Sequence, residues 1–567
     1  MNDANASRVL PAAPVIRLDD YARNGGGRGM AAARQLGPDG TVEHLDAAGL
    51  RGRGGAGFPT ARKWSAVRAR EAAALPATVV VNAAEGEPGS FKDRAILQRN
   101  PFAVLEGALI AATTVDADRI VVAVKASFAQ EVAVLRQAVA ELAEKGWSEG
   151  VAVGVFEGPG AYLYGEETGL LEALDGRHPF PRVAPPYRYG VDEVPPDEPA
   201  PPALVNNVET FANVPGIMAN GPDWFREVGT RGSPGTVVCT VSGAVEHAGV
   251  AEVAMGTPLL DLITDVGGGA RAGHQLVAAM SGVANPLIAA DQFDTPLSHE
   301  AMQAVGSGLG AAGFIVFDDD TDFAALAHAV SRFLGVESCG QCVPCKQDGV
   351  ALMEILDRVR RSDARDEDLA AIDDHLATIA DGARCYLATQ HQLVIGSIRD
   401  RFGDDLRAHV AGTVPAAAPL LIAPITSLHD GGADLDDRQL AKQPDWSFDM
   451  VDSGKSPADR FEDPQPSTGR ASSPPAAPAP GAARDEPPDE RADAPDDDSD
   501  TRAEHPADRV EDDPEAPLYS SVPIETDEGV VVVQQQNVGP GNEEGGGEWP
   551  DPDAPPRPPA PGATRSN

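Results

Sequence analysis

Cysteine is scarce in this sequence, with five residues in 567. Secreted scaffolds held by disulfides are shorter and much richer in cysteine, so that class is excluded. No stretch approaches the roughly 18 consecutive apolar residues that a membrane-spanning helix needs. The N-terminal residues lack a basic segment followed by an apolar run, so we expect no signal peptide. The expected location is the cytoplasm, with membrane association only through a larger complex.

Basic residues are also few. The 45 Lys and Arg residues stand against 87 Asp and Glu, which gives a formal net charge of -42. A field of this sign repels nucleic acid and anionic lipid, so neither is an expected partner. Any nucleotide would have to be held by backbone N–H groups and a few placed cations.

The composition changes abruptly near Pro415. Residues 413–567 are dominated by Pro, Ala, Gly, Asp and Glu. Such a segment buries too little apolar surface to offset its ordering entropy, so it is predicted to be an acidic disordered tail. One apolar run within it, residues 529–533, is either a short binding motif or a chance occurrence. Residues 1–28 are predicted to be loose as well.

The chain between these tails has three regions with different sequence patterns. Residues 29–235 alternate β-branched runs with helical patterns, which predicts a parallel sheet with right-handed helical crossovers. The expected strands are 77–82, 119–124 and 151–156, and the expected helices are 105–113 and 128–144. Residues 236–320 are rich in strands and glycine turns, which predicts a compact α+β domain. Residues 321–412 predict a helical bundle with short loops.

Four of the five cysteines form a pattern. Cys339, Cys342 and Cys345 have C-x2-C-x2-C spacing on a turn that contains glycine. Cys385 follows two predicted helices, 349–361 and 366–380, and an antiparallel pair returns the chain to its starting point. Three close thiolates and one distant thiolate favour a [4Fe-4S] cluster. A four-cysteine zinc site is the rival, although structural zinc more often uses two C-x2-C pairs. Cys239 stands alone in an apolar strand and is predicted to be a core residue.

A glycine-rich loop, GLRGRGGAGFPT at residues 49–60, is the second candidate site. Glycines let backbone N–H groups approach a phosphate closely, and Arg53 and Lys63 add positive charge. The pattern matches neither a P-loop nor a G-x-G-x-x-G fingerprint, so a structural turn stays open. Polar clusters at the ends of the first and third strands, and an Asn pair at 206–207, fall where open α/β sheets bind ligands.

Six motifs in collinear order carry a resemblance. They are the glycine-rich loop, NAAEGEPGSFKDR from residue 82, GAYLYGEETGLLEALDG from 160, VNNVETFANVP from 205, SGAVEHAGVAEVAMGTPL from 242 and ESCGQCVPCKQ from 337. Together they resemble the flavin-binding subunit of NADH dehydrogenases. That family includes the NuoF or 51-kDa subunit of respiratory complex I and the diaphorase subunits of NAD-reducing hydrogenases and formate dehydrogenases. The resemblance covers about residues 29–410.

The resemblance implies a Rossmann-like FMN domain, a β-grasp domain of the SLBB type and a helical bundle carrying the cluster. It implies hydride transfer from NADH to FMN, followed by single-electron transfer to the [4Fe-4S] cluster, with no acid–base residue needed. The FMN site would comprise Gly52, Arg53, Gly54, Lys63, Asn82, Glu85, Tyr162, Gly165, Glu166, Val205, Asn206 and Asn207. The NAD site would overlap Gly55, Phe58, Glu87 and Glu167.

Three positions depart from the family pattern. Ala84 replaces a carboxylate at the flavin site, Ala184 replaces a lysine that contacts the dinucleotide, and Ala66 replaces an aromatic residue. Losing one charge-assisted contact costs roughly 1.5–3 kcal/mol of binding. The identity of the donor is therefore the open question, and Tyr187 retains the aromatic ring that follows position 184.

Three functions follow in order of preference. The first is an NADH-oxidising subunit, and the second uses FMN and the cluster with another donor, such as a ferredoxin. The third is a non-catalytic assembly protein with a structural cluster. Because the sequence holds ligands for one cluster, the acceptor must be another chain, and the resemblance implies a thioredoxin-like [2Fe-2S] subunit.

Overall fold

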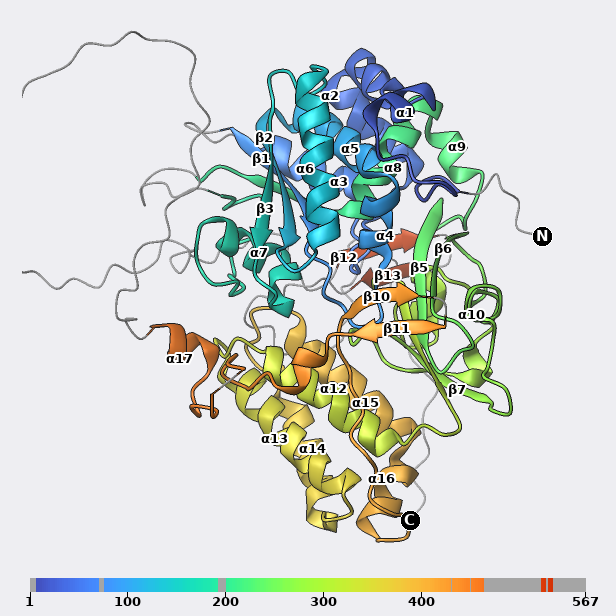
Figure 1. The fold of residues 1–567 in the computed structure, drawn as a ribbon, viewed down its shortest axis with the longest axis vertical. Coiled ribbons are helices and arrows are strands. Elements are labelled where there is room, and N and C mark those ends of the chain that lie inside the picture. The colour runs from blue at the N-terminus through green and yellow to red at the C-terminus, as the bar shows by residue number, and fades with distance from the viewer. Residues whose placement is uncertain are drawn as a thin grey trace, which may run out of the picture.

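The computed structural model describes residues 7–70, 76–191, 200–429, 431–448, 450–462, 522–526 and 529–533. An α/β domain lies at the top of Figure 1, a smaller mixed domain at the right and a helical bundle at the bottom. Among the described residues, none of the helices has the length and apolar character needed to cross a membrane.

A four-stranded parallel sheet forms the first domain, in the order β3-β2-β1-β4. Its strands are β1 (Ala77–Ala83), β2 (Ala117–Lys125), β3 (Ala152–Gly158) and β4 (Ala203–Asn207). Helices α5 (Pro101–Val115) and α6 (Ala129–Glu144) make the crossovers between the first three strands. These elements confirm the predicted strands and helices of this domain. Val79, Val80 and Val81 are fully buried, as expected for a parallel strand covered on both faces.

Residues 7–28 are ordered, and the prediction of a loose N-terminus is wrong for them. Helix α1 (Leu18–Arg23) precedes α2 (Arg28–Ala48), and the α2 backbone is interrupted at Gly37. The backbone N–H groups of Val9 and Leu10 donate to the carboxylate of Glu252, at 2.9 and 2.8 Å. A distant carboxylate therefore fixes a segment that has no internal pattern of its own.

The second domain is a five-stranded mixed sheet in the order β6-β5-β9-β7-β8. It comprises β5 (Thr236–Gly243), β6 (Gly249–Ala254), β7 (Leu276–Ser281), β8 (Ile288–Ala289) and β9 (Gly313–Asp318), with helices α10 (Leu259–Gly267) and α11 (His299–Ala304). Strands β5 and β9 are parallel, whereas their outer neighbours are antiparallel to them. This arrangement confirms the predicted α+β domain, and Cys239 is fully buried in its core.

The bundle consists of α12 (Phe323–Glu337), α13 (Val343–Arg360), α14 (Asp366–Thr378), α15 (Leu387–Arg401) and α16 (Gly403–Val410). Helices α13 and α14 lie between the three-cysteine turn and Cys385, as the spacing predicts. The bundle lies below the α/β domain in Figure 1, and Cys385 lines one cavity together with the strand-end residues Asn82 and Asn207.

The chain does not become disordered at residue 413, and that prediction is wrong for residues 413–461. This segment forms a hairpin of β10 (Ile425–His429) and β11 (Gly432–Leu435), a turn η3 (Asp437–Leu440) and a short helix α17 (Pro457–Glu462). Ile425 is buried in the core of the first domain. Farther on, β12 (Val522–Thr526) pairs antiparallel with β13 (Gly529–Val533). The rest of the predicted tail lies outside the described residues.

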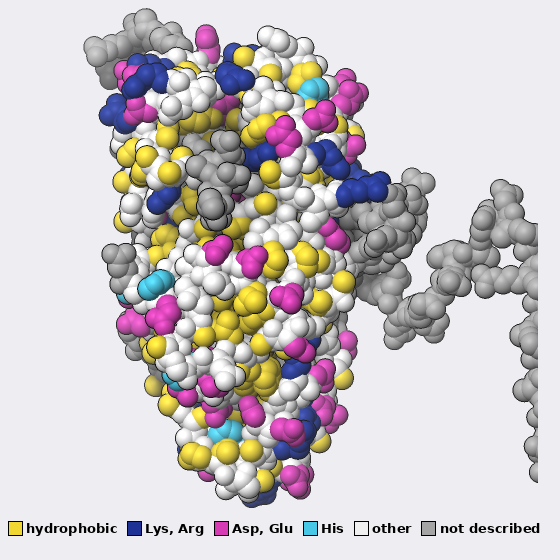
Figure 2. Space-filling view, turned by 90° about the vertical axis from the view of Figure 1, so that its right-hand side faces the viewer, with side chains coloured by type: hydrophobic (Ala, Val, Ile, Leu, Met, Phe, Trp, Pro, Cys, Tyr) yellow, Lys and Arg dark blue, Asp and Glu magenta, His cyan; other side chains and the backbone are white. Residues whose placement is uncertain are grey.

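Figure 2 shows one face of the molecule. On it, the Lys and Arg side chains stand singly or in small groups among Asp and Glu side chains. This face carries no extended basic field among the described residues.

Candidate flavin and cluster site

One cavity joins the carboxyl end of the parallel sheet to the bundle. It encloses about 770 Å³, counting its open mouth. Its walls come from the glycine-rich loop, from the segments that follow β1 and β4, and from the start of α15. The residues that matter most are Gly54, Asn82, Glu87, Tyr162, Asn207 and Cys385. Its lining of backbone, amide and carboxylate groups beside tyrosine rings suits a flat ring with a polar chain.

The glycine-rich loop forms a narrow turn beside this cavity. The Gly52 N–H donates to the Phe58 carbonyl at 2.8 Å, and the Arg51 side chain donates to the Gly57 carbonyl at 2.8 Å. Gly57 has φ of 63°, and a Cβ on it would lie 2.5 Å from the ring of His299. This position therefore requires glycine for both its backbone angle and its close contact with α11.

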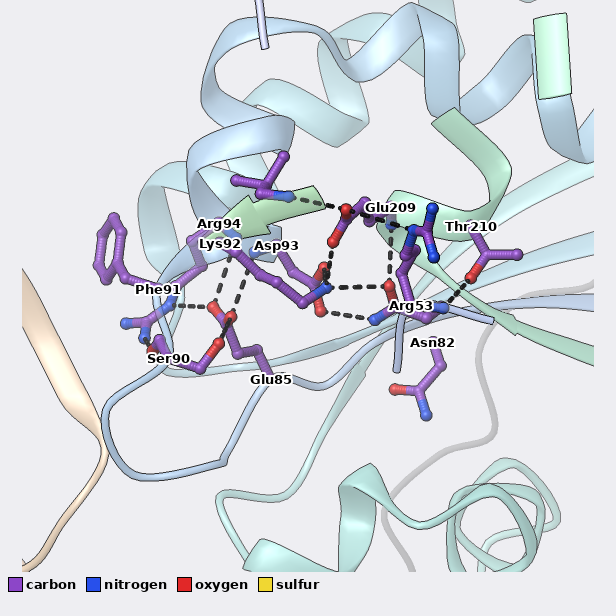
Figure 3. A network of polar contacts seen from close by, with 12 residues as sticks. Arg53, Asn82, Glu85, Ser90, Phe91, Lys92, Asp93, Arg94, Glu209 and Thr210 are labelled. Carbon is purple, nitrogen blue, oxygen red and sulfur yellow. Dashed lines mark hydrogen bonds and ion pairs between the residues drawn. The ribbon is translucent and has the colours of Figure 1, made fainter. Parts of the chain in front are cut away.

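A buried ion cluster supports the loop from below (Figure 3). The Lys92 ammonium at the start of α4 (Lys92–Arg99) lies 2.7 Å from Asp93 Oδ1 and 2.9 Å from Glu209 Oε2. It also donates to Asn207 Oδ1 at 3.1 Å. Burial alone would lower the pKa of Lys92, but the two carboxylates outweigh burial and raise the pKa.

Arg53 belongs to this buried layer. Its backbone N–H donates to Thr210 Oγ1 at 2.9 Å, and its guanidinium donates to the Pro234 carbonyl at 3.1 Å. Arg53 Nε lies 3.9 Å from Glu209 Oε1, and the side chain is 2 % exposed. The partners of Arg53 are thus Glu209 and Thr210, which follow β4, and Pro234, which precedes β5.

Glu85 also turns inward. Its carboxylate accepts from Ser90 Oγ at 2.6 Å and from Arg94 Nε at 3.0 Å. Burial would raise the pKa of Glu85, but the guanidinium of Arg94 and the other donors outweigh burial and lower it. The residue lines the cavity, and protein donors already bind both of its carboxylate oxygens.

Tyr162 links three parts of the molecule. Its hydroxyl donates to Glu87 Oε2 at 2.6 Å and accepts from Gln390 Nε2 of α15 at 3.0 Å. The other oxygen of Glu87 accepts from the Val283 N–H of the second domain at 2.6 Å. Burial raises the pKa of Glu87 to about 7. The phenol and the carboxylate are thus fixed in the wall of the cavity.

The helix that follows β3 begins at the cavity. Glu166 precedes α7 (Glu167–Leu174), and its carboxylate accepts from the backbone N–H groups of Thr168 and Gly169 at 3.0 and 2.7 Å. Burial raises the pKa of Glu166 to about 7. Glu167 holds the Lys63 ammonium of α3 (Thr60–Arg68) at 2.6 Å.

The remaining predicted residues lie along β1 and β4 and on the glycine-rich loop. Asn82 Nδ2 donates to the Gly165 carbonyl at 2.8 Å, so the strand end is tied to the turn before α7. The Val205 carbonyl accepts from Lys63 at 3.2 Å, and Asn206 Oδ1 accepts from Trp64 Nε1 at 2.9 Å. Gly55 and Phe58 lie on the glycine-rich loop, where Gly55 faces a neighbouring cavity.

The four cysteines meet at the upper end of the bundle. Ser338 Oγ lies 3.3 Å from Cys345 Sγ, Gln341 Nε2 donates to Cys339 Sγ at 3.5 Å, and the Arg384 N–H donates to Cys342 Sγ at 3.3 Å. Burial raises the pKa of the Cys345 thiol to about 12. Thiolates at such a site need a bound cation, and N–H···S contacts of this kind suit cluster sulfurs.

The spacing of the thiols bears on the choice between zinc and a cluster. Zinc with bonds of about 2.3 Å in tetrahedral geometry holds its sulfurs about 3.8 Å apart. Among the described residues, no three of these cysteines have sulfurs within 4.8 Å of one another. The sulfurs thus stand farther apart than the sulfurs of a tetrahedral zinc site.

Sequence reasoning missed several residues of the cavity. Gln390, Tyr386, Leu387 and Ala311 line it, although none belongs to a motif identified in the sequence. Gln390 lies in the first turn of α15, shortly after Cys385, and this proximity along the chain is the one signal that could have suggested it. Ala311 follows from the position of the loop before β9, which only the tertiary structure reveals.

The departures from the family pattern fall in three different environments. Ala84 is buried and lines the cavity, so a methyl group stands where the pattern has a carboxylate. Ala66 is on the exposed side of α3. Ala184 is 2 % exposed and packs with Tyr189 and Ala200. Position 184 is thus closed by apolar contacts.

Comparison with known proteins gives a consistent result. Residues 45–216 match the Nuo51 FMN-binding domain, residues 238–283 match the SLBB domain, and residues 325–409 match the iron–sulfur binding region of NADH-ubiquinone oxidoreductase F. The F 2 subunit of the NADH-quinone oxidoreductase of Rhizobium meliloti is 34 % identical over 403 residues, covering 69 % of this chain and 94 % of the relative.

Two further relatives broaden the comparison. NADP-reducing hydrogenase subunit HndC of Solidesulfovibrio fructosivorans is 34 % identical over 69 % of this chain and 80 % of its own length. The crystal structure of an air-oxidized NAD+-reducing [NiFe]-hydrogenase matches with a TM-score of 0.61 and 30 % identity, covering 72 % of this chain and 69 % of that one.

Proposed function

The chain belongs to the family of the F subunits of NADH-quinone oxidoreductase, and from that premise we propose that it passes electrons from NADH through FMN to a [4Fe-4S] cluster. The observation that carries the proposal is the shared cavity. The strand-end residues Asn82 and Asn207 and the cluster residue Cys385 line the same space. A flavin bound there lies next to the group that must accept its electrons.

The residues present fit FMN. Asn82 and Asn207 offer amide groups, and backbone lies open at Gly54, Gly86 and Gly165. We assign the FMN contacts to these residues and to Tyr162. Arg53 and Glu85 act through the protein, because Glu209 and Arg94 already hold them. When bound, FMN supplies the conversion between two-electron and one-electron transfer.

The residues also fit a [4Fe-4S] cluster. We assign its ligands to Cys339, Cys342, Cys345 and Cys385. Cys339 and Cys342 lie in the turn, Cys345 lies in the first turn of α13, and Cys385 lies just before α15. Gln341 and the Arg384 N–H donate to the sulfurs and so help to set the potential of the site.

We place the donor in the cavity that adjoins the flavin cavity. It encloses about 1390 Å³, counting its mouth, and shares Gly54, Glu87 and Ala311 with the first. Arg51 Nη2 and His299 Nε2 are buried there without a hydrogen-bond partner among the described residues. These side chains suit the phosphates of a dinucleotide. Gly55 and Glu87 line the same cavity, and Glu87 also lines the flavin cavity.

A donor other than NADH is the second candidate. It is favoured by Ala184, whose buried apolar packing leaves no cation at a position where the family pattern has lysine. The acceptor in either case is a partner redox subunit, and a thioredoxin-like [2Fe-2S] protein is the partner that we propose. The names of the relatives, which are subunits of larger oxidoreductases, support a multi-subunit assembly.

Anaerobic stopped-flow absorbance of the purified holoprotein separates these candidates. Bleaching of the flavin by NADH within seconds of mixing supports NADH as the donor. Bleaching by reduced ferredoxin and not by NADH supports the second. A protein that retains no FMN after reconstitution contradicts both. Arg51→Met, which keeps the length of the side chain, is expected to weaken NADH reduction, whereas Arg62→Met on the exposed side of α3 serves as the matched control.

A further inference from the structure

Residues 436–461, named here the C-terminal strap, cross the bundle and end beside the cysteine turn. The strap begins after β11, passes through η3 and ends in α17, at the lower left of the α/β domain in Figure 1. The family match to the iron–sulfur region ends at residue 409, before the strap begins. Its contacts nevertheless concentrate on the backbone that carries Cys339.

The first anchor is a buried ion pair. The Lys442 ammonium lies 2.7 Å from each oxygen of the Glu337 carboxylate, and Gln439 Nε2 donates to Glu337 Oε1 at 3.1 Å. Lys442 and Glu337 are 7 % and 4 % exposed. Glu337 is two residues before Cys339 and also accepts from the Tyr162 N–H at 3.2 Å. The strap therefore neutralises a carboxylate between the flavin cavity and the cysteine turn.

The second set of anchors is made to backbone groups. Trp446 Nε1 donates to the Val336 carbonyl at 2.8 Å, and the Ala458 N–H donates to the Cys339 carbonyl at 2.9 Å. Lys346 donates to the Gly335 and Ser338 carbonyls at 2.9 and 3.0 Å and to the Pro444 carbonyl at 2.5 Å. One ammonium thus ties the strap to both sides of the turn.

The end of the strap closes against the α/β domain. The ring of Phe461 stacks on His178 with centroids 4.1 Å apart and an angle of 21°. Phe180 lies between, with centroids 5.7 Å from Trp446 and 6.3 Å from Phe461. Gly340, within the cysteine turn, has φ of 87°, and a Cβ there would collide with Ser456. The strap is packed on the turn without space between them.

We propose that the C-terminal strap is a working part of the cluster site, which clamps the Cys339 turn through Lys442 and keeps solvent from the bound cluster. Arg332 of α12 donates to the carbonyls of Gln439, Leu440 and Lys442 and holds the start of the strap. The strap's own donors reach the Val336 and Cys339 carbonyls and the carboxylate of Glu337, at and just before the cysteine turn. Opening the strap exposes the turn, and the cluster iron then becomes accessible to chelators.

The test uses the full-length protein loaded with its cluster and measures iron release to a ferrous chelator under anaerobic conditions. Lys442→Met removes the clamp and is expected to release iron about tenfold faster, which corresponds to about 1.4 kcal/mol in the opening barrier. Lys442→Arg retains the ion pair and should release iron at nearly the wild-type rate. Arg438→Met alters an exposed pair within the strap and is the matched control.

A second measurement does not depend on the cluster. In the iron-free protein, alkylation of each cysteine is followed by peptide mass spectrometry. Lys442→Met should speed labelling of Cys339 and Cys342 about tenfold while Cys239, buried in β5, stays protected. Because this inference rests on the proposed cluster, a protein that binds no iron contradicts the proposed function, while the labelling rates still test the strap.

Two milder variants guard against a failure to fold. Lys442→Met with Glu337→Gln leaves no unpaired buried carboxylate, and Trp446→Phe removes a single hydrogen bond to Val336. Both should accelerate labelling of Cys339, by about twofold to tenfold for Trp446→Phe because one hydrogen bond contributes about 0.5–1.5 kcal/mol. Wild-type rates of iron release and labelling in these variants and in Lys442→Met would overturn the proposal, and so would equal acceleration at Cys239.

Discussion

The buried cluster around Lys92 gives the sharpest stability prediction. The Lys92 side chain is 1 % exposed, and its ammonium contacts Asp93, Glu209 and Asn207 within 3.1 Å. Replacing it by methionine keeps most of the volume and removes the charge. Arg53 is then the remaining cation near Glu209, with Nε 3.9 Å from Oε1. Breaking a buried pair by removing one partner costs about 3–5 kcal/mol, so we expect Lys92→Met to destabilise the protein by that amount.

The loss should be visible in two assays. Urea denaturation of the cofactor-free protein, followed by circular dichroism, gives the free energy of unfolding. FMN binding, followed by quenching of flavin fluorescence, should weaken, because Asp93 and Asn207 line the cavity. Lys145→Met is the matched control, since that lysine is 47 % exposed and its pair with Asp19 contributes at most about 1 kcal/mol.

A compensating variant tests the reasoning itself. Lys92→Met combined with Glu209→Gln removes one of the two uncompensated carboxylates and should recover part of the lost stability. If Lys92→Met alone unfolds within about 1 kcal/mol of the wild type, the cluster contributes no more than an exposed pair. That result would refute the assignment of the buried ions as the support of the glycine-rich loop.

Three other predictions concern single positions. Gly107→Ala should lower the free energy of unfolding by about 1–3 kcal/mol in urea denaturation, because the added Cβ would collide with the Phe211 carbonyl. The control is Gly396→Ala, which is also within a helix but has open space around its Cβ, and it should raise the free energy of unfolding by about 0.5–1 kcal/mol. The pKa of Glu87 is raised to about 7 from 4.5, so the folded state binds the Glu87 proton more tightly than the unfolded state does. The cofactor-free protein should therefore lose stability as the pH rises from 4.5 to 7. Thermal melting across this pH range should show a weaker pH dependence in Glu87→Gln. Cys345→Ser should abolish the [4Fe-4S] absorbance while FMN binding persists, and bound zinc by elemental analysis of the wild type would contradict the cluster.

Much of the fold could be predicted because its signals are local. The apolar runs that became β1 and β2 are continuous, as strands buried on both faces must be. The three-cysteine spacing and the two following helices placed Cys385 correctly at the same end of the bundle. These features depend on periodicity and short distances along the chain, which the sequence displays directly.

The errors concern segments that are fixed by distant partners. The strap is rich in Asp and falls within the acidic tail that the sequence predicts to be disordered, but Lys442 pairs with Glu337 and Phe461 stacks on His178. Residues 7–10 depend in the same way on Glu252, and Tyr21 and Gly27 depend on Glu106. The contact of Arg53 with Glu209 could not be predicted either, because its partner lies far along the chain. A few buried anchors can order a segment whose average composition predicts disorder.

An anaerobic titration of the holoprotein with NADH, followed together by flavin absorbance and electron paramagnetic resonance, tests the central claim most directly. The account predicts that NADH bleaches the flavin and that the signal of a reduced [4Fe-4S] cluster appears. In Cys385→Ser, the flavin should still bleach and the cluster signal should be lost. The contrary result is a wild-type protein in which NADH fully reduces the flavin but the bound cluster stays oxidised, although the solution potential is low enough to reduce the cluster. That result would contradict electron transfer across the shared cavity.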